Sequence, residues 1–107
     1  MPVKIFRAAR DRLVEIWNYT EETWGEEQAD NYVRSLVNAA TTLADRPYRW
    51  RPVADRELPG IFFFRHKHHC IFFRELEAGS VGVISILHEK MDLPSRLTED
   101  ARRGEEE

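Results

Sequence analysis

The chain has 107 residues, of which 42% are hydrophobic and 33% charged, with a formal net charge of -3 at pH 7. This balance is that of a folded domain with one modest core, and it excludes an intrinsically disordered chain. No apolar segment approaches the roughly 20 residues of a membrane-spanning helix and the single cysteine, Cys70, excludes an intramolecular disulfide, so we expect a cytoplasmic protein.

The N-terminal part predicts a short strand at residues 3–6, followed by two helices. Small and apolar residues recur every three or four positions over residues 9–24 and again over residues 29–43, the spacing of one buried helical face. Gly25 is expected to end the first helix and Pro47 to stop the second. Because the joint between them is short, we expect an antiparallel helical hairpin, with Trp17 and Trp24 on its buried face.

The C-terminal part predicts a loop and then a sheet. Prolines and Gly60 favour a connecting loop over residues 46–60, and strand-like segments follow at residues 61–65, 70–75 and 81–87, which we expect to form an antiparallel meander. All four residues 61–64 are apolar, so this strand is either covered on both faces or flanked by a bound partner. We expect a single domain over residues 1–97, ending in a short turn or helix, and a charged, flexible tail over residues 98–107.

Charge is distributed unevenly along the chain. Residues 1–45 are mildly acidic, whereas residues 46–74 contain many arginines, few acids and three histidines. This middle segment would attract an acidic partner.

A metal site and a nucleophilic cysteine are both disfavoured. His66, His68, His69 and Cys70 carry zinc-binding groups, but in an extended strand His68 and Cys70 share a face from which His69 points away. We therefore expect no metal ion and no cofactor. Cys70 lies in an apolar segment and is expected in the core.

A metal-independent ribonuclease remains an alternative, because RNA cleavage needs only a general base, a general acid and cations around the phosphate. Arg65, Arg74 and His88, together with the neighbouring His66 and His68, carry such groups. The opposing interpretation is that the arginines are solubilising edge charges and His88 ends the last strand. Trp50, between Arg49 and Arg51, is a candidate for contact with a partner.

Several short motifs, in their order along the chain, resemble the ParE toxins of the RelE/ParE superfamily. The resemblance extends from about residue 3 to residue 97 and rests on Leu13, Glu15-Ile16-Trp17, Tyr19, Trp24-Gly25, Gln28-Ala29, Tyr32, Leu36, Arg46-Pro47, Pro59-Gly60, Ile71-Phe72-Phe73-Arg74 and Ile86-Leu87-His88-Glu89-Lys90-Met91-Asp92. It implies an α+β fold: a strand, a helix hairpin and a three-stranded antiparallel meander, with the helices packed on one antiparallel sheet.

The resemblance also implies a function. A ParE-like protein would be the toxin of a bacterial type II toxin-antitoxin system, neutralised by a cognate antitoxin and inhibiting DNA gyrase by protein binding without catalysis. The residues expected to face the target are Arg65, Arg74, His88, Lys90 and Asp92. Those expected to face the antitoxin are Trp50, Phe62 and Phe64.

Two alternatives stay open. One is a RelE-like messenger RNA endonuclease that uses Arg65, Arg74 and His88, although the chain has no tyrosine beyond Tyr48 to complete the pattern of that group. The other is an inactive, toxin-like binding module.

Overall fold

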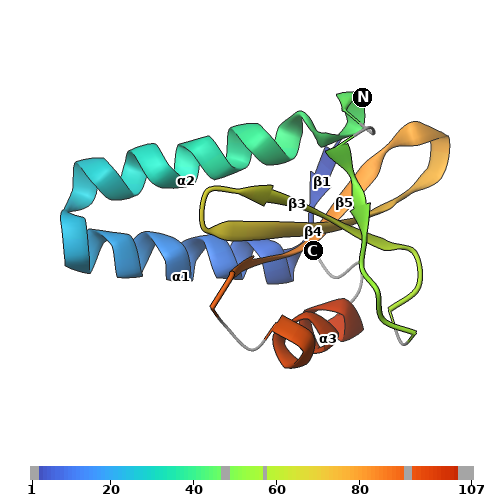
Figure 1. The fold of residues 1–107 in the computed structure, drawn as a ribbon. Coiled ribbons are helices and arrows are strands. Elements are labelled where there is room, and N and C mark those ends of the chain that lie inside the picture. Colours follow the sequence, from blue (N-terminus) through green and yellow to red (C-terminus); the bar gives the residue numbers. More distant parts are fainter. Residues whose placement is uncertain (1–2, 47–48, 57, 91–92, 104–107) are drawn as a thin grey trace.

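The computed structural model describes residues 3–46, 49–56, 58–90 and 93–103 and shows one five-stranded sheet accompanied by helices (Figure 1). The strands, in sheet order β1-β5-β4-β3-β2, span Val3–Ile5 (β1), Val81–His88 (β5), His69–Glu75 (β4), Ile61–His66 (β3) and Arg51–Pro52 (β2). The helices span Arg7–Trp24 (α1), Glu26–Thr41 (α2) and Leu93–Arg103 (α3), with 3-10 turns at Leu43–Asp45 and Glu77–Gly79. The predicted α+β class and element order are confirmed.

The sheet contains the expected meander and two further strands at its edges. Strands β3, β4 and β5 pair antiparallel, whereas β1 pairs parallel with β5, so the complete sheet is mixed and not antiparallel throughout. The loop expected over residues 46–60 contributes the two-residue strand β2 against β3. Pro52 is tolerated there because an edge strand needs no outward N–H donor. The expected helix stop at Pro47 lies outside the described residues.

Each face of the sheet carries its own core. On one face Ile71, Phe73 and Val83 pack with Leu36 and Ala40 of α2. On the other, Cys70, Phe72 and Ile84 pack with residues that include Phe6, Leu58 and Leu97. The chain itself therefore covers β3 and β4 on both sides, which explains why their sequences do not alternate cleanly between apolar and polar residues.

The helical hairpin is confirmed, but one of its expected core residues is exposed. Gly25 joins the helices with a φ of 96°, a left-handed value that favours glycine. The joined end of α1 and α2 projects past the ends of the strands (Figure 1). Trp24 lies there and is 70% exposed, so its placement in the core was wrong. Trp17 is half-buried, and its indole Nε1 donates a hydrogen bond to Asp30 at 2.8 Å.

The C-terminal helix replaces part of the expected tail. Because α3 continues to Arg103, the boundary expected at residue 97 falls inside a helix, and Asp100 within it is fully buried. The physical reason is an ion pair with α1, since Arg12 donates hydrogen bonds to both carboxylate oxygens of Asp100 at 2.9 and 3.0 Å. Residues 104–107 of that tail lie outside the described part. None of the described helices combines the length and apolarity needed to cross a membrane.

Candidate functional site

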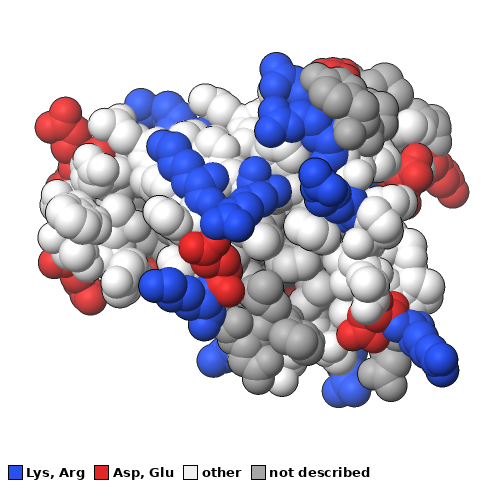
Figure 2. Space-filling view, viewed as in Figure 1, with Lys and Arg blue, Asp and Glu red and all other residues white. Residues whose placement is uncertain are grey.

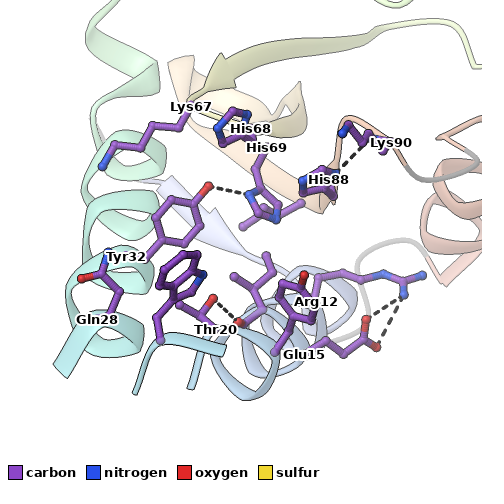
Figure 3. Close-up of a pocket in the computed structure, with 14 residues that line it drawn as sticks. Arg12, Glu15, Thr20, Gln28, Tyr32, Lys67, His68, His69, His88 and Lys90 are labelled. Carbon is purple, nitrogen blue, oxygen red and sulfur yellow. Dashed lines mark hydrogen bonds and ion pairs between the residues drawn. The ribbon is translucent and has the colours of Figure 1, made fainter. Parts of the chain in front are cut away.

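A cleft of about 730 Å³ opens between the helical hairpin and the end of the sheet where the β3–β4 turn meets the end of β5 (Figure 3). We call it the histidine cleft. Its lining combines aromatic, imidazole and basic side chains, among them Tyr19, Trp24, Tyr32, Lys67, His68, His69, His88 and Lys90. The cleft thus draws on four separate elements, which only the folded chain brings together.

Strand register gathers the histidines. The tight turn between β3 and β4 holds Lys67 at a φ of 55° and sets His66 opposite His69, while His69 in turn lies opposite His88 of β5. The His69 and His88 rings meet edge to face with centroids 5.1 Å apart, and those of His68 and His88 lie 6.2 Å apart. Register thus brings His88 to His68 and His69 in the cleft. His66 lies outside the cleft, with its Nε2 3.1 Å from the Ser35 hydroxyl oxygen.

His69 is the most constrained member of the group. It is only 8% exposed, and its Nδ1 is hydrogen-bonded to the Tyr32 hydroxyl at 2.6 Å. Burial, followed by repulsion from His88, His68 and His66, lowers the pKa of His69 to about 4. Burial also raises the pKa of Tyr32. Both groups are therefore neutral at pH 7, and His69 is a weak proton acceptor there.

Glu89 organises the exposed rim of the cleft. Its carboxylate forms an ion pair with Arg65 and lies 3.3 Å from Nδ1 of His68. The pKa of Glu89 is lowered, first by the hydrogen bond from His68 and then by the charge of Arg65. Much of the positive charge of Arg65 is consequently balanced inside the molecule.

Three of the residues predicted to face the target lie at the same end of the sheet. His88 and Lys90 line the histidine cleft, and the backbone N–H of Lys90 donates to Nδ1 of His88 at 3.0 Å. Arg65 borders the same end of the sheet through its pair with Glu89. Asp92 lies outside the described residues.

Arg74 lies apart from this group. Arg65 of β3 pairs in register with Cys70 of β4, whereas Arg74, four residues further along β4, pairs with Ile61 of β3. Four residues of strand correspond to about 13 Å. Arg65, Arg74 and His88, the set named for the ribonuclease alternative, therefore do not converge on one phosphate.

The three residues predicted to face an antitoxin pack within the molecule. Trp50 donates from its indole Nε1 to the carbonyl oxygen of Leu43 at 2.8 Å and lies 5.0 Å, centroid to centroid, from Phe73. Phe62 stacks beside both rings, and Phe64 lies beneath the guanidinium of Arg49. All three are half-buried, which leaves a partner only part of each ring.

Sequence reasoning missed the aromatic side of the cleft. Tyr19 and Trp24 are 69% and 70% exposed and line the cleft, although helical spacing had assigned Trp24 to the core. Tyr32 both packs against the core and hydrogen-bonds His69. The available signal was the concentration of aromatic residues near Gly25, where the helices turn.

Cys70 and the histidines lie in different environments. Cys70 packs in the core on the α3 face of the sheet, where burial raises the pKa of its thiol, whereas His69 contacts Tyr32 of the helical hairpin. Among the described residues, no group of three or more histidine, cysteine, aspartate or glutamate side chains has an arrangement suited to a metal ion.

Comparisons with known proteins identify the family. The family model described as ParE toxin of type II toxin-antitoxin system, parDE, matches residues 3–93. Toxin ParE1 of Mycobacterium tuberculosis is 34% identical over 90 residues, covering 84% of this chain and 91% of that protein. Toxin ParE1 of Caulobacter vibrioides is 32% identical over 97 residues, covering 90% and 97%.

Solved structures show the same fold at lower sequence identity. A chain of the chromosomal ParDE toxin-antitoxin system from P. aeruginosa superposes with a TM-score of 0.69 at 19% identity, covering 82% of this chain and 95% of that one. A chain of the toxin-antitoxin complex RelBE2 from Mycobacterium tuberculosis gives 0.63 at 22% identity, with coverages of 81% and 88%. The extent of the family match and the identity to its members show that this chain belongs to the ParE toxin family of type II toxin-antitoxin systems.

Proposed function

We propose that this ParE family member arrests growth by binding DNA gyrase, and that a cognate antitoxin neutralises it. The observation that supports this mechanism is that the histidine cleft lacks a well-placed set of proton-transferring and phosphate-binding side chains among its described residues. His69 has a pKa of about 4, Arg65 is paired with Glu89, and Arg74 lies at the other end of β4. These features favour a surface that binds a protein over one that transfers protons.

The chemistry of the cleft suits a protein target. Tyrosine and tryptophan are among the residue types that carry most binding energy at protein interfaces. Tyr19 and Trp24 supply exposed rings from α1. His88 and Lys90 supply polar contacts from the end of β5 (Figure 3). We propose that Arg65, His88 and Lys90 contact the target at this end of the sheet. Arg74 would contact it only if the target also reached the opposite end, and Asp92 is kept as a prediction.

The antitoxin is proposed to cover the exposed aromatic surface of the helical hairpin. ParDE and RelBE2 are toxin-antitoxin assemblies, and this chain shares their fold. Tyr19 and Trp24 are the large exposed rings of that hairpin, whereas Trp50, Phe62 and Phe64 offer only their outer edges. A partner that buried both exposed rings and filled the histidine cleft beside them would also block access to His88 and Lys90.

The experiment is induction of the chain alone in a bacterial host, with growth, plasmid supercoiling and messenger RNA integrity followed together. We expect arrest, loss of negative supercoiling and intact RNA. The double variant His88→Ala/Lys90→Ala should reduce the loss of supercoiling about tenfold. Arg102→Ala, an exposed arginine of α3 outside the cleft, is the matched control and should act like the unaltered chain. Arrest with fragmented RNA and normal supercoiling would contradict the proposal.

A further inference from the structure

A second hollow, of about 560 Å³, lies between α2 and β3 on the other side of Lys67 from the histidine cleft. We call it the basic groove. Its lining includes Asn38 of α2, Phe64, Arg65 and Lys67 of the β3 segment, and Arg46 and Arg49 of the connection between them. Arg65 and Lys67 border both this groove and the end of the sheet proposed to contact gyrase, whereas Arg46 and Arg49 belong to the groove alone.

The groove concentrates positive charge on a protein whose net charge is negative. Among its described lining residues are four cations, Arg46, Arg49, Arg65 and Lys67, and no carboxylate. All four are exposed. Basic side chains gather over the middle and upper part of the face in Figure 2; acidic ones lie at its left end, where the helical hairpin turns, and in smaller groups at the centre and right. Arg65 is paired with Glu89, so Arg46, Arg49 and Lys67 provide most of the positive potential of the groove, despite the overall charge of -3.

The side chains that line the groove favour one of two possible polyanions, a nucleic acid or an acidic peptide. A protein segment needs apolar pockets for its anchoring side chains. The large apolar side chain of this groove is Phe64, and the guanidinium of Arg49 covers it at 4.8 Å from the ring centroid. That stacking fixes the plane of Arg49 and leaves its N–H edges available to oxygen atoms. A partner that offers charge and few apolar anchors therefore fits best, which favours a nucleic acid over an acidic peptide.

The cations of the groove come from two segments of the chain, an arrangement that suits a short stretch of nucleic-acid backbone. Arg46 and Arg49 belong to the connection after α2, with Arg49 over Phe64, whereas Lys67 lies in the turn that follows β3. One strand of a duplex carries a phosphate about every 3.4 Å of its axis, so cations from two segments that line one groove can contact neighbouring phosphates. We propose that the basic groove binds the phosphodiester backbone of a nucleic acid, DNA or RNA, through Arg46, Arg49 and Lys67. The readout is of charge and not of sequence.

The test measures binding of the full-length chain to fluorescent oligonucleotides at several salt concentrations. The probes are a 12-base-pair DNA duplex, a 12-nucleotide single-stranded DNA and an RNA of the same sequence, with a poly-glutamate peptide as the alternative polyanion. The variant is Arg46→Gln/Lys67→Gln, which leaves the Arg49–Phe64 contact and the Arg65–Glu89 pair in place. The control is Arg96→Gln/Arg102→Gln on α3, which removes the same charge from exposed positions outside the groove.

We expect at least one nucleic-acid probe to bind, and the groove variant to weaken that binding about tenfold and to reduce the salt dependence by about two released ions. The control pair should change affinity less than twofold. The probe that binds more tightly, DNA or RNA, shows which nucleic acid the groove prefers. Equal weakening by both pairs would reduce the effect to net charge and overturn the proposal. Binding of poly-glutamate with none of the oligonucleotides would assign the groove to an acidic protein segment instead.

Discussion

At the scale of single residues, the ion pair between Arg12 and Asp100 is the most consequential contact that joins distant parts of the chain. Asp100 is fully buried, and its Oδ2 also accepts a hydrogen bond from Ser85 at 2.6 Å. Arg12 contacts Glu15 as well, at 3.1 Å. Every polar group of this cluster therefore has a partner, which is the condition under which buried charges are tolerated.

Removal of Asp100 tests how much the folded chain depends on its ion pair with Arg12. We predict that Asp100→Ala lowers the free energy of unfolding by about 3–5 kcal/mol, because it leaves the Arg12 guanidinium buried and without its main partner. Urea denaturation monitored by tryptophan fluorescence measures the loss. Glu99→Ala removes an exposed carboxylate that lies 4.0 Å from Arg12 and should cost less than about 1 kcal/mol. A loss of similar size in both variants would contradict this account.

His69 predicts a pH dependence of stability. The pKa of His69 is about 4 in the folded chain and about 6.5 in an unfolded one. The unfolded state therefore binds the proton first, and stability present above pH 6.5 is lost as the pH falls. Between pH 7 and pH 5 the free energy of unfolding should fall by up to about 2 kcal/mol.

The test compares two histidine variants over that pH range. His69→Gln should flatten the dependence, while His68→Gln should retain it, because the side chain of His68 is 72% exposed. His66, whose pKa burial also lowers, adds to the slope in the same direction and is unchanged in both variants. An unaltered slope in His69→Gln would show that its imidazole is not protected from protonation.

At the scale of the elements, β5 passes close to the junction of β1 and α1, where Gly82 faces Phe6. A Cβ at position 82 would lie 2.7 Å from the Cζ of Phe6, whose ring is fully buried and has no room to withdraw. The absence of a side chain at Gly82 thus lets the strand after Val81 pass beneath that ring.

We predict that Gly82→Ala lowers the free energy of unfolding by about 1–3 kcal/mol through overpacking. Phe6→Leu removes the clashing ring atoms, so the same glycine substitution should cost less in that background. A double-mutant cycle by chemical denaturation measures the coupling. Additive effects would mean that the Phe6 ring is not the obstacle.

The elements also show where prediction from sequence succeeds and where it fails. Periodicity over residues 9–24 and the glycine at position 25 were sufficient for the helical hairpin, because both are local signals. Helix α3 was underestimated because its stability comes from Asp100 meeting Arg12, 88 positions apart in the sequence. Trp24 was misplaced because periodicity indicates a helical face but not how far the neighbouring sheet extends.

Some features of the candidate site could likewise be predicted from the sequence, and others could not. The basic and histidine-rich character of residues 65–69 was visible in the sequence, and strand register adds His88 to it. The separation of Arg74 from Arg65 also follows from register, which sequence composition does not specify. Nothing local indicated that Tyr32 would meet His69.

At the scale of the whole molecule, the two hollows and the acidic end of the hairpin form distinct surfaces. The histidine cleft combines exposed rings with imidazole and basic side chains, whereas the basic groove is lined mainly by cations and polar side chains. Lys67 borders both. A protein target at the cleft and a nucleic-acid backbone at the groove would therefore lie side by side, which suits a target enzyme that itself holds DNA.

The measurement that tests the central claim most directly is the supercoiling of relaxed plasmid by purified gyrase in the presence of increasing amounts of the purified chain, with a messenger RNA in the same reaction. The account predicts that supercoiling falls with dose while the RNA stays intact, and that His88→Ala/Lys90→Ala shifts the dose about tenfold upward. Full supercoiling at a large excess of folded chain, with or without RNA cleavage, would contradict it.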